Sequence, residues 1–289
     1  MTGPVTVYIL SAFAAGPGGG NPAGVVPDAA GLNSDRMQAI ARHLALSETA
    51  FVLPGRRTDR RLRFFTPTAE VDLCGHATVA AWALLHQLGR VTPGRYHQEL
   101  AAGTLEVEVR ADGLVGMEQP RPAFGRRFDV AGVADLLGLA PTDLAVPGLP
   151  IQAVSTGLAD ILVPVRSRAR LAAIRPDFPR LADFNAASAT VGVHAFCLEP
   201  DAGEAAARCR NFAPRYGIPE ESATGSAAGA LACYLHRYRP GRRRFLFEQG
   251  RELGRPSRIF VELETAGADI RRVVVSGYGR QLETRRVES

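Results

Sequence analysis

The chain has 289 residues and a formal net charge of +5, and every cationic side chain is arginine because the sequence contains no lysine. The absence of lysine excludes a pyridoxal Schiff base, a class I aldolase imine and a P-loop lysine. Apart from Arg242–Arg244 and Arg271–Arg272, the arginines are scattered, and they lack interleaved aromatic residues, which argues against nucleic acid as a partner. No apolar run reaches the ~18 residues of a membrane span, and the N-terminus lacks the cationic segment of a signal peptide. We therefore expect a globular, cytoplasmic protein with no membrane partner.

Alternating apolar residues and turn-forming residues predict many short strands and few helices. The expected strands are residues 5–13, 25–26, 49–53, 61–65, 104–110, 152–156, 161–165, 191–198, 207–212, 245–250, 258–263 and 272–277. The expected helices are residues 34–43, 130–139 and 167–173, with one more helix after Gly75 and another after Gly225. A loop is expected at residues 16–22. This mixture predicts the α+β class.

Two stretches that lie 150 positions apart resemble one another. The chain reads G-H-A-T-V-A-A-W-A-L-L from Gly75 and G-S-A-A-G-A-L-A-C-Y-L from Gly225, and Phe-Thr-Pro at 65–67 matches Phe-Ala-Pro at 212–214. A helix that is apolar on all sides is buried all round. The pattern predicts an internal duplication, with a curved sheet around one central helix in each half and a site between the halves.

The start of each central helix is a predicted binding site. Unpaired backbone N–H groups at a helix N-terminus favour an anion such as a carboxylate, and glycine permits its close approach. The alternative is that these residues merely cap two core helices. The predicted substrate-binding residues in the two turns are Cys74, Gly75, Thr224, Gly225 and Ser226.

Three ionisable residues are candidates for proton transfer. His76 lies at the tip of the first helix, where the dipole is expected to lower its pKa and favour the neutral ring. Glu48 lies next to an apolar strand, where burial is expected to raise its pKa so that it exchanges protons near neutral pH. Glu221 precedes the second turn and could point inward. The alternatives are a capping role for His76 and Glu48 and a solvated loop position for Glu221.

The cysteines and histidines argue against a metal site. Four cysteines show no CxxC spacing, so we expect free thiols, and six histidines form no HxxxH pattern. A cofactor-independent racemase of this two-helix type needs one thiol from each half. Cys74 precedes Gly75, but Thr224 precedes Gly225, which argues against a two-thiol racemase.

Several stretches of the chain resemble the PhzF phenazine-biosynthesis-like family, and together they span it from the first loop to the last strands. They are residues 19–25, 47–49, 65–78, 223–227, 248–250 and 254–257. The resemblance implies a diaminopimelate-epimerase-like fold of two similar domains, each a mixed sheet curled around a central helix. The expected domains are 1–120, rejoined by 272–289, and 121–271, with the active site in the cleft between them.

The resemblance also implies an activity. Family members move a proton, and so a double bond, in a dihydro-hydroxyanthranilate without metal or organic cofactor, and they are usually homodimers. Their catalytic glutamate and histidine match Glu48 and His76, and the matching first loop adds Asn21 to the substrate-binding residues. The third catalytic residue differs, because Glu221 and Ser222 replace the usual Asp-Pro and place the acid one methylene further out.

We therefore expect an isomerase that acts on a small unsaturated carboxylate, amino-acid-derived or similar to dihydro-hydroxyanthranilate, in secondary-metabolite biosynthesis. Three alternatives stay open. One is an epimerase or racemase on the same fold, and a second is a lyase or hydrolase that breaks a carbon–carbon bond. The third is a non-catalytic protein that binds a small carboxylate.

Overall fold

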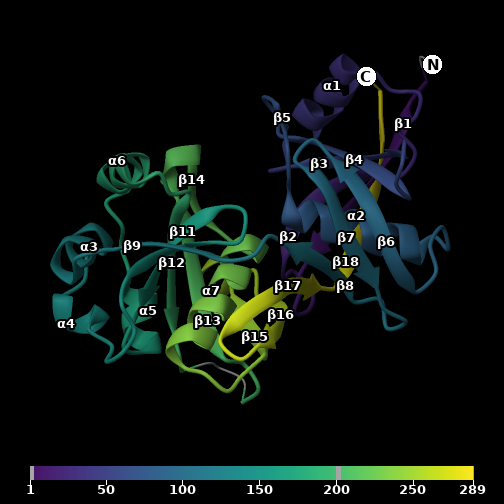
Figure 1. Cartoon of the computed structure of the whole chain (residues 1–289). Coiled ribbons are helices and arrows are strands. Elements are labelled where there is room, and N and C mark those ends of the chain that lie inside the picture. The colour runs from purple at the N-terminus through teal and green to yellow at the C-terminus, as the bar shows by residue number, and fades with distance from the viewer. Residues whose placement is uncertain (1–2, 200–202, 289) are drawn as a thin grey trace. The chain divides into compact units, whose positions relative to one another are not determined.

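The computed structural model describes residues 3–199 and 203–288. The chain forms two compact units, the first of Met1–Glu118 with Ser276–Ser289 and the second of Gln119–Val275. Each unit combines a mixed sheet with helices, as expected for an α+β protein (Figure 1).

The described part of the first unit has two helices and nine strands. They are β1 (Val5–Ala12), β2 (Asn21–Val26), α1 (Ser34–Leu44), β3 (Thr49–Pro54), β4 (Arg60–Phe65), β5 (Glu70–Val71), α2 (Gly75–Gln87), β6 (Gly94–Leu100), β7 (Gly103–Val109), β8 (Val115–Gln119) and β18 (Gly279–Val287).

The second unit contains the remaining elements. They are β9 (Ala123–Arg127), α3 (Val130–Leu137), α4 (Pro141–Leu144), β10 (Gln152–Ser155), β11 (Ala159–Pro164), α5 (Arg168–Ala173), α6 (Phe178–Ser188), β12 (Gly192–Cys197), β13 (Ala207–Ala213), η1 (Pro214–Tyr216), β14 (Ile218–Glu221), α7 (Gly225–Tyr238), β15 (Arg244–Gln249), η2 (Arg251–Leu253), β16 (Ser257–Ala266) and β17 (Asp269–Gly277).

The strands of the two units pair in the same succession. In the first unit β1 runs antiparallel to β2, β2 parallel to β3, β3 antiparallel to β4, β4 parallel to β6 and β6 antiparallel to β7. In the second unit β10, β11, β12, β13, β15 and β16 repeat these five pairings with the same directions. The duplication predicted from the two helices therefore extends to the sheets.

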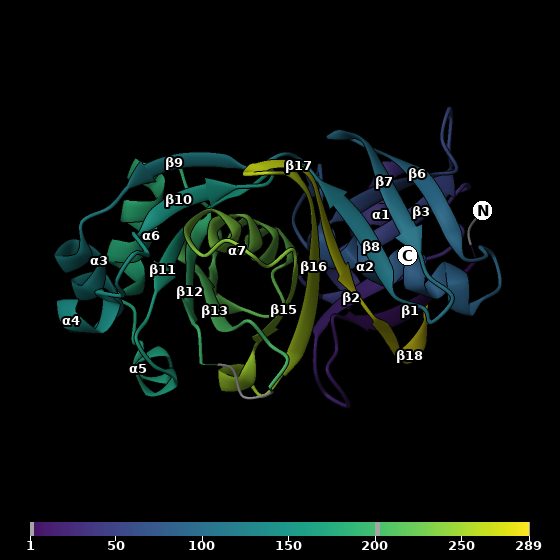
Figure 2. The ribbon, with the colours of Figure 1, turned by 60° about the horizontal axis from the view of Figure 1, so that its bottom comes forward.

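A helix buried on every side lies at the centre of each unit. All residues from His76 to Leu85 of α2 are buried, as are all residues from Ala227 to His236 of α7. Figure 2 shows α7 surrounded by β10, β11, β12, β13 and β15. A flat sheet would leave one side of such a helix in water, so the sheet has to curl around it. Trp82, the largest buried side chain of α2, donates a 2.8 Å hydrogen bond from its indole nitrogen to Gln98 Oε1.

The outer face of each sheet is covered by the other helices. In the first unit α1 contributes Met37 and Ile40 to an apolar cluster with Phe51 of β3. In the second unit α3, α5 and α6 contribute to a cluster that includes Ile161 and Val193. Successive strand residues therefore point alternately to the central helix and to the outer helices.

Several elements differ from the sequence-based expectation. The expected loop at 16–22 ends early, because β2 begins at Asn21 and pairs with β1. The strands β5, β6, β8, β9 and β14 and the helices α4 and α6 were not predicted. The residue pattern did not predict β18 either, although the resemblance assigned residues 272–289 to the first domain. This strand pairs with β1 along its length, but most of its residues are exposed and lack an alternating apolar pattern.

Among the described residues, none of the helices combines the length and the apolar character needed to cross a membrane.

The central position of Trp82 predicts a large effect of truncation. We expect Trp82→Ala to lower the free energy of unfolding by about 3–5 kcal/mol, because it empties a buried site and leaves Gln98 Oε1 without its donor. The exposed Leu282 is the control, and Leu282→Ala is expected to change stability by less than about 0.5 kcal/mol. Urea unfolding measures the stability of both variants. Circular dichroism is the probe, because Trp82→Ala removes the chain's one tryptophan and so its fluorescence signal. Equal unfolding midpoints would show that α2 is not the centre of the core.

Candidate functional site

An acid and a histidine meet at the N-terminus of α2. Glu48 Oε2 lies 3.2 Å from His76 Nε2. The same ring nitrogen is 3.4 Å from Ser47 Oγ, and the other ring nitrogen, Nδ1, is 3.4 Å from Cys74 Sγ. The side chain of His76 is 6% exposed and that of Glu48 is 18% exposed, so the pair is largely shielded from water but reachable.

The backbone of the first unit fixes the position of Glu48. Glu48 directly precedes β3, and its carbonyl accepts a 3.1 Å hydrogen bond from the N–H of Gly24 on β2. A Cβ atom at Gly24 would lie 2.9 Å from Thr49 Oγ1 and 3.0 Å from Leu44 Cδ1, so a larger residue would displace these buried side chains. The acid is therefore held by strand pairing rather than by a free loop.

The two partners shift one another's pKa. Burial raises the pKa of Glu48, but the hydrogen bond and charge of His76 outweigh burial, so the pKa lies below its usual value. Burial lowers the pKa of His76, but its partners Cys74 and Glu48 raise it well above the usual value. Burial also raises the pKa of the Cys74 thiol, which is therefore uncharged at neutral pH. We accordingly assign the shift of His76 to Glu48, and the two form an ion pair.

Both pKa directions expected from the sequence were wrong. Glu48 was expected to have a raised pKa and His76 a lowered one, on the basis of burial and the helix dipole alone. The two groups face each other at 3.2 Å, and this close opposite charge outweighs both effects. The contact between the two groups therefore favours a carboxylate on Glu48 and an imidazolium on His76.

Glu48, Cys74 and His76 also form the one group of possible metal ligands among the described residues. Their ligand atoms all lie within 4.8 Å of one another, and a sulfur, nitrogen and oxygen set of this kind suits zinc. The sequence predicted no metal site. A metal at this place would have to displace the proton of His76, because only the neutral imidazole binds metals.

The first turns of α2 and α7 present backbone donors. Within the described chain, the N-cap residues Cys74 and Thr224 make no side-chain capping hydrogen bond to the turns that begin at Gly75 and Gly225. The first N–H groups of a helix have no partner inside the helix. Each unit therefore has a helix N-terminus with backbone donors, and the binding of an anion there stays a prediction.

Glu221 and Thr224 are fixed by a buried glutamine of the second unit. Gln249 Nε2 donates to the carbonyl of Glu221 at 2.8 Å and to Thr224 Oγ1 at 3.0 Å. Its Oε1 accepts from the N–H of Thr224 at 3.0 Å. The side chain of Gln249 thus holds both ends of the segment that leads into α7.

The two adjacent acids before α7 have different surroundings. Glu220 forms a bidentate ion pair with Arg210, with two N–O distances of 2.8 Å. Arg210 also donates to backbone carbonyls near α5, so this pair ties the strand to the outer helices. Glu221 lies on the other side of β14, and Asn211 of β13 is its cross-strand partner.

Two predicted substrate-binding residues remain, Asn21 of the first unit and Ser226 of the second. Asn21 is buried at the start of β2, opposite Ala12 of β1. Ser226 lies in the first turn of α7, and its carbonyl accepts a 3.1 Å hydrogen bond from Thr156 Oγ1. The prediction that a cleft between the halves holds the substrate stays a prediction.

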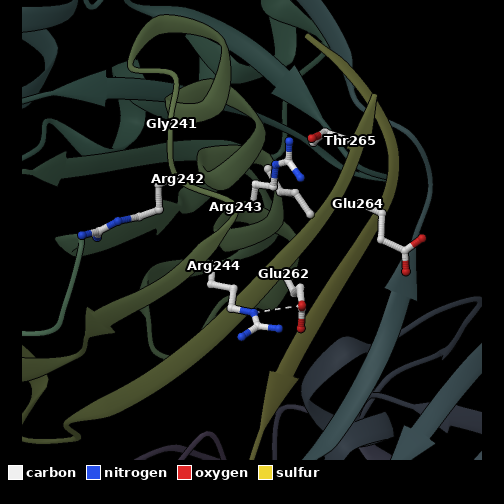
Figure 3. Close-up of a pocket in the computed structure, with 8 residues that line it drawn as sticks. Gly241, Arg242, Arg243, Arg244, Glu262, Glu264 and Thr265 are labelled. Atoms are coloured by element: carbon white, nitrogen blue, oxygen red, sulfur yellow. Dashed lines mark hydrogen bonds and ion pairs between the residues drawn. The ribbon is translucent and has the colours of Figure 1, made fainter. Parts of the chain in front are cut away.

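A surface hollow of about 760 Å³ lies elsewhere, between the end of α7 and β16 (Figure 3). It is lined by residues 241–244 and 262–265 and contains none of the predicted site residues. Its Arg244–Glu262 ion pair spans 3.0 Å, but the arginine side chain is 83% exposed. Exposed pairs of this kind contribute little to stability or binding, and we assign no function to the hollow.

Comparison with known proteins identifies the family. The family model described as phenazine biosynthesis-like protein matches residues 10–284. The chain belongs to the phenazine biosynthesis-like family. Among its relatives in this family, an uncharacterized isomerase of Deinococcus radiodurans is 39% identical, with 96% of this chain and 92% of that protein covered. The trans-2,3-dihydro-3-hydroxyanthranilate isomerase of Pseudomonas aeruginosa is 36% identical, with 94% and 95% covered.

Solved structures agree with the family assignment. The PhzF-family protein of Bacillus anthracis has a TM-score of 0.90 at 30% identity, with 98% of this chain and 99% of that chain covered. A hydroxyproline epimerase of Agrobacterium vitis has a TM-score of 0.66 at 13% identity, with 99% and 93% covered, and this likeness concerns the fold alone. The predicted family, the diaminopimelate-epimerase-like fold and the isomerase class are confirmed.

Two residues at these sites were not predicted as site residues. Ser47 contacts His76 and lies in the Ser-Glu-Thr step that resembles the family. Gln249 lies in a Glu-Gln-Gly string that also belongs to the resemblance, but its contacts with Thr224 depend on strand pairing. The sequence feature that could have identified Gln249 as a site residue is its polar amide at the end of the apolar strand β15.

The ion pair predicts how His76 titrates. We expect Glu48→Gln to move the midpoint of His76 to lower pH, because the carboxylate that favours the imidazolium is lost. Cys74→Ala is the matched control and is expected to leave His76 with a raised pKa. NMR titration of the imidazole signals measures the midpoint, with His76→Asn used for assignment. A midpoint lowered only by Cys74→Ala would assign the shift to the thiol.

The same pair predicts a window of stability. The pKa of His76 is raised on folding. Its contribution to stability is therefore fully present below pH 6.5, the ordinary pKa of histidine, and is lost as the pH rises through the pKa of His76 in the folded protein. The pKa of Glu48 is lowered on folding. Its contribution to stability is therefore fully present above pH 4.5, the ordinary pKa of glutamate, and is lost as the pH falls through the pKa of Glu48 in the folded protein. We expect wild type to exceed His76→Asn in stability by the largest margin between pH 4.5 and pH 6.5. A pH-independent difference in urea midpoint would contradict the ion pair.

Proposed function

We propose that the protein is a cofactor-independent isomerase that moves a proton, and with it a double bond, in a small unsaturated carboxylate. The contact that supports this proposal best is the 3.2 Å pair of Glu48 and His76 at the start of α2. It combines a proton acceptor with a proton donor in one partly buried place, as proton transfer requires.

Glu48 is the proposed base. Its carboxylate takes a proton from an activated carbon, so that a C–H bond breaks and an O–H bond forms while the electron pair moves into the conjugated system. The proton then returns to a different carbon, and the double bond shifts with no change of mass. His76, as the imidazolium, donates a hydrogen bond to the substrate oxygen on which negative charge develops.

The substrate carboxylate is proposed to bind at helix N-termini. The backbone N–H groups near Gly75 and those near Gly225 and Ser226 are the proposed donors, with Asn21, Cys74 and Thr224 as neighbouring contacts. Dipoles at uncapped helix ends favour an anion without any cationic side chain. A carboxylate-bearing ligand fits this chemistry.

Glu221 is proposed to orient a polar group of the substrate. The acid is retained at the position where the family resemblance has aspartate, and Gln249 fixes its backbone. Its extra methylene favours a substrate of different shape from the compound named for the Pseudomonas aeruginosa relative. The proposed substrate class is an amino-acid-derived or dihydro-hydroxyanthranilate-like unsaturated acid. The proposed setting is a cytoplasmic biosynthetic pathway for a secondary metabolite.

We also propose that the enzyme is a homodimer, as the family resemblance implies. Analytical ultracentrifugation tests this proposal. A sedimentation mass equal to the 30.8 kDa of one chain, at all concentrations tested, would overturn it.

The central test is proton exchange in heavy water. A panel of unsaturated amino and hydroxy acids, including trans-2,3-dihydro-3-hydroxyanthranilate, is incubated with wild type, Glu48→Gln and the exposed control Glu283→Gln. Wild type and the control are expected to incorporate deuterium at carbon without any other change of mass. Glu48→Gln is expected to be about 10²–10⁴-fold slower, which is the usual contribution of a general base.

The other outcomes identify the alternatives. Exchange at the α-carbon with inversion indicates an epimerase, and a product of lower mass indicates a lyase or hydrolase. Ligand binding without exchange indicates a binding protein. Equal exchange by wild type and Glu48→Gln would contradict the assignment of the base.

The length of Glu221 predicts a second kinetic effect. We expect Glu221→Asp to lower kcat on the native substrate by about 100-fold, because the carboxyl group withdraws by ~1 Å from its contact. Glu262→Gln, at an exposed acid of the same unit, is the control. Steady-state kinetics measure the loss, and an unchanged kcat for both Glu221→Asp and Glu221→Gln would remove this residue from the site.

A further inference from the structure

A strip of polar side chains crosses the inner sheet of the second unit. Asp160 on β11, His194 on β12 and Asn211 on β13 are each no more than 1% exposed. Strand register places His194 opposite Asn211 and Asn211 opposite Glu221 of β14. Asp160 is opposite Gly192, which has no side chain to separate it from Asn211. The four polar residues therefore share one face of four neighbouring strands.

This polar strip lies on the face that covers α7. Phe196 follows His194 by two residues and so projects from the same face of β12. Its ring centroid is 5.7 Å from that of Tyr234 on α7. Ala195, between them, belongs to the outer apolar cluster. The polar strip therefore lies in the interior of the unit and leads to Glu221, four residues before the helix.

The same positions in the first unit are apolar. The two units are aligned by matching Phe-Thr-Pro at 65–67 with Phe-Ala-Pro at 212–214. From this match, the residue pairs of neighbouring strands in each unit identify the counterpart of every residue of the polar strip. The counterparts of Asp160, His194, Asn211 and Glu221 are Ala23, Ala50, Phe64 and Val71, in that order. The fold itself therefore does not require polar side chains at these positions.

The hydrogen bonds of the polar strip are incomplete. Asn211 Nδ2 is 3.2 Å from His194 Nδ1, and both Asn211 and the N–H of Gly192 hydrogen-bond to Asp160. Among the described residues, Asp160 Oδ1 and His194 Nε2 have no hydrogen-bond partner. Buried polar atoms without partners destabilise a fold, so their presence here needs a reason other than stability.

The charges within the polar strip point to Glu221. Burial raises the pKa of Asp160 to about 7; the hydrogen bond from Asn211 opposes this and the charge of Glu221 adds to it. Burial lowers the pKa of His194 to about 3, so this ring is neutral and offers no compensating positive charge. Two carboxyl groups on one face in a medium of low dielectric do not both ionise readily.

Resting on the proposed role of Glu221, we propose that Asp160 is a positioning residue for Glu221: the proton on Asp160 leaves Glu221 as the one negative charge of the polar strip, and so sets the electrostatic surroundings in which Glu221 meets the substrate. Loss of this proton places a second negative charge near a negatively charged substrate.

The first experiment needs no substrate. NMR with ¹³C-labelled aspartate carboxyl groups follows Asp160 in wild type and in Glu221→Gln, and Asp160→Asn identifies the signal. We expect the Asp160 midpoint near pH 7 in wild type and at lower pH in Glu221→Gln, because the neighbouring charge is gone. An identical midpoint in both proteins would overturn the inference, whatever the outcome for the proposed function.

The second experiment measures the pH profile of deuterium exchange. Asp160→Asn has the shape of the protonated acid, so we expect its kcat/KM to stay level through pH 7, whereas wild type falls about tenfold per pH unit above its midpoint. The control Thr190→Val removes a buried hydroxyl on a different part of the unit and is expected to keep the wild-type profile. Identical profiles for wild type and Asp160→Asn would overturn the inference. If no panel compound exchanges, the proposed function fails and the NMR titration alone decides.

Discussion

Each unit of the structure depends on enclosing a helix that has no polar side. Such a helix cannot lie on a flat sheet, because water would reach its outer face, so the strands curl around it. The backbone groups without helical partners then lie at the ends of the helix, and the first turn presents such N–H groups. His76 on α2 and Ser226 on α7 occupy this turn. The burial of an apolar cylinder thus determines where polar chemistry can occur in each unit.

The two units use the same backbone for different electrostatics. In the first, an imidazolium and a carboxylate neutralise each other at 3.2 Å, and the strand positions that correspond to the polar strip are apolar. In the second, the corresponding strands bury Asp160 and a neutral His194, and the segment before α7 is tied down by Gln249. The two units share one scaffold, and their side chains differ where the sheet faces the start of the central helix.

Sequence reasoning was accurate wherever the signal is local. Uniformly apolar helices, the glycine turns and the family motifs led to the fold class and identified Glu48 and His76 as separate candidates. Features that depend on contacts between residues far apart in the sequence were predicted wrongly or not at all. The pKa directions required knowing that the two groups touch, and the edge strand β18 has no apolar pattern of its own. Asp160 and His194 are far apart in the chain, and strand register alone brings them onto one face.

Gly192 limits what side chain the second unit can carry at one position of its sheet. Its counterpart in the first unit is Glu48, one residue before the strand position that pairs with Phe65. A Cβ atom at Gly192 would lie 2.3 Å from the carbonyl oxygen of Phe212, so an acid cannot be introduced there without moving the backbone. Substitution of Gly192 alone therefore cannot give the second unit the acid that Glu48 supplies in the first.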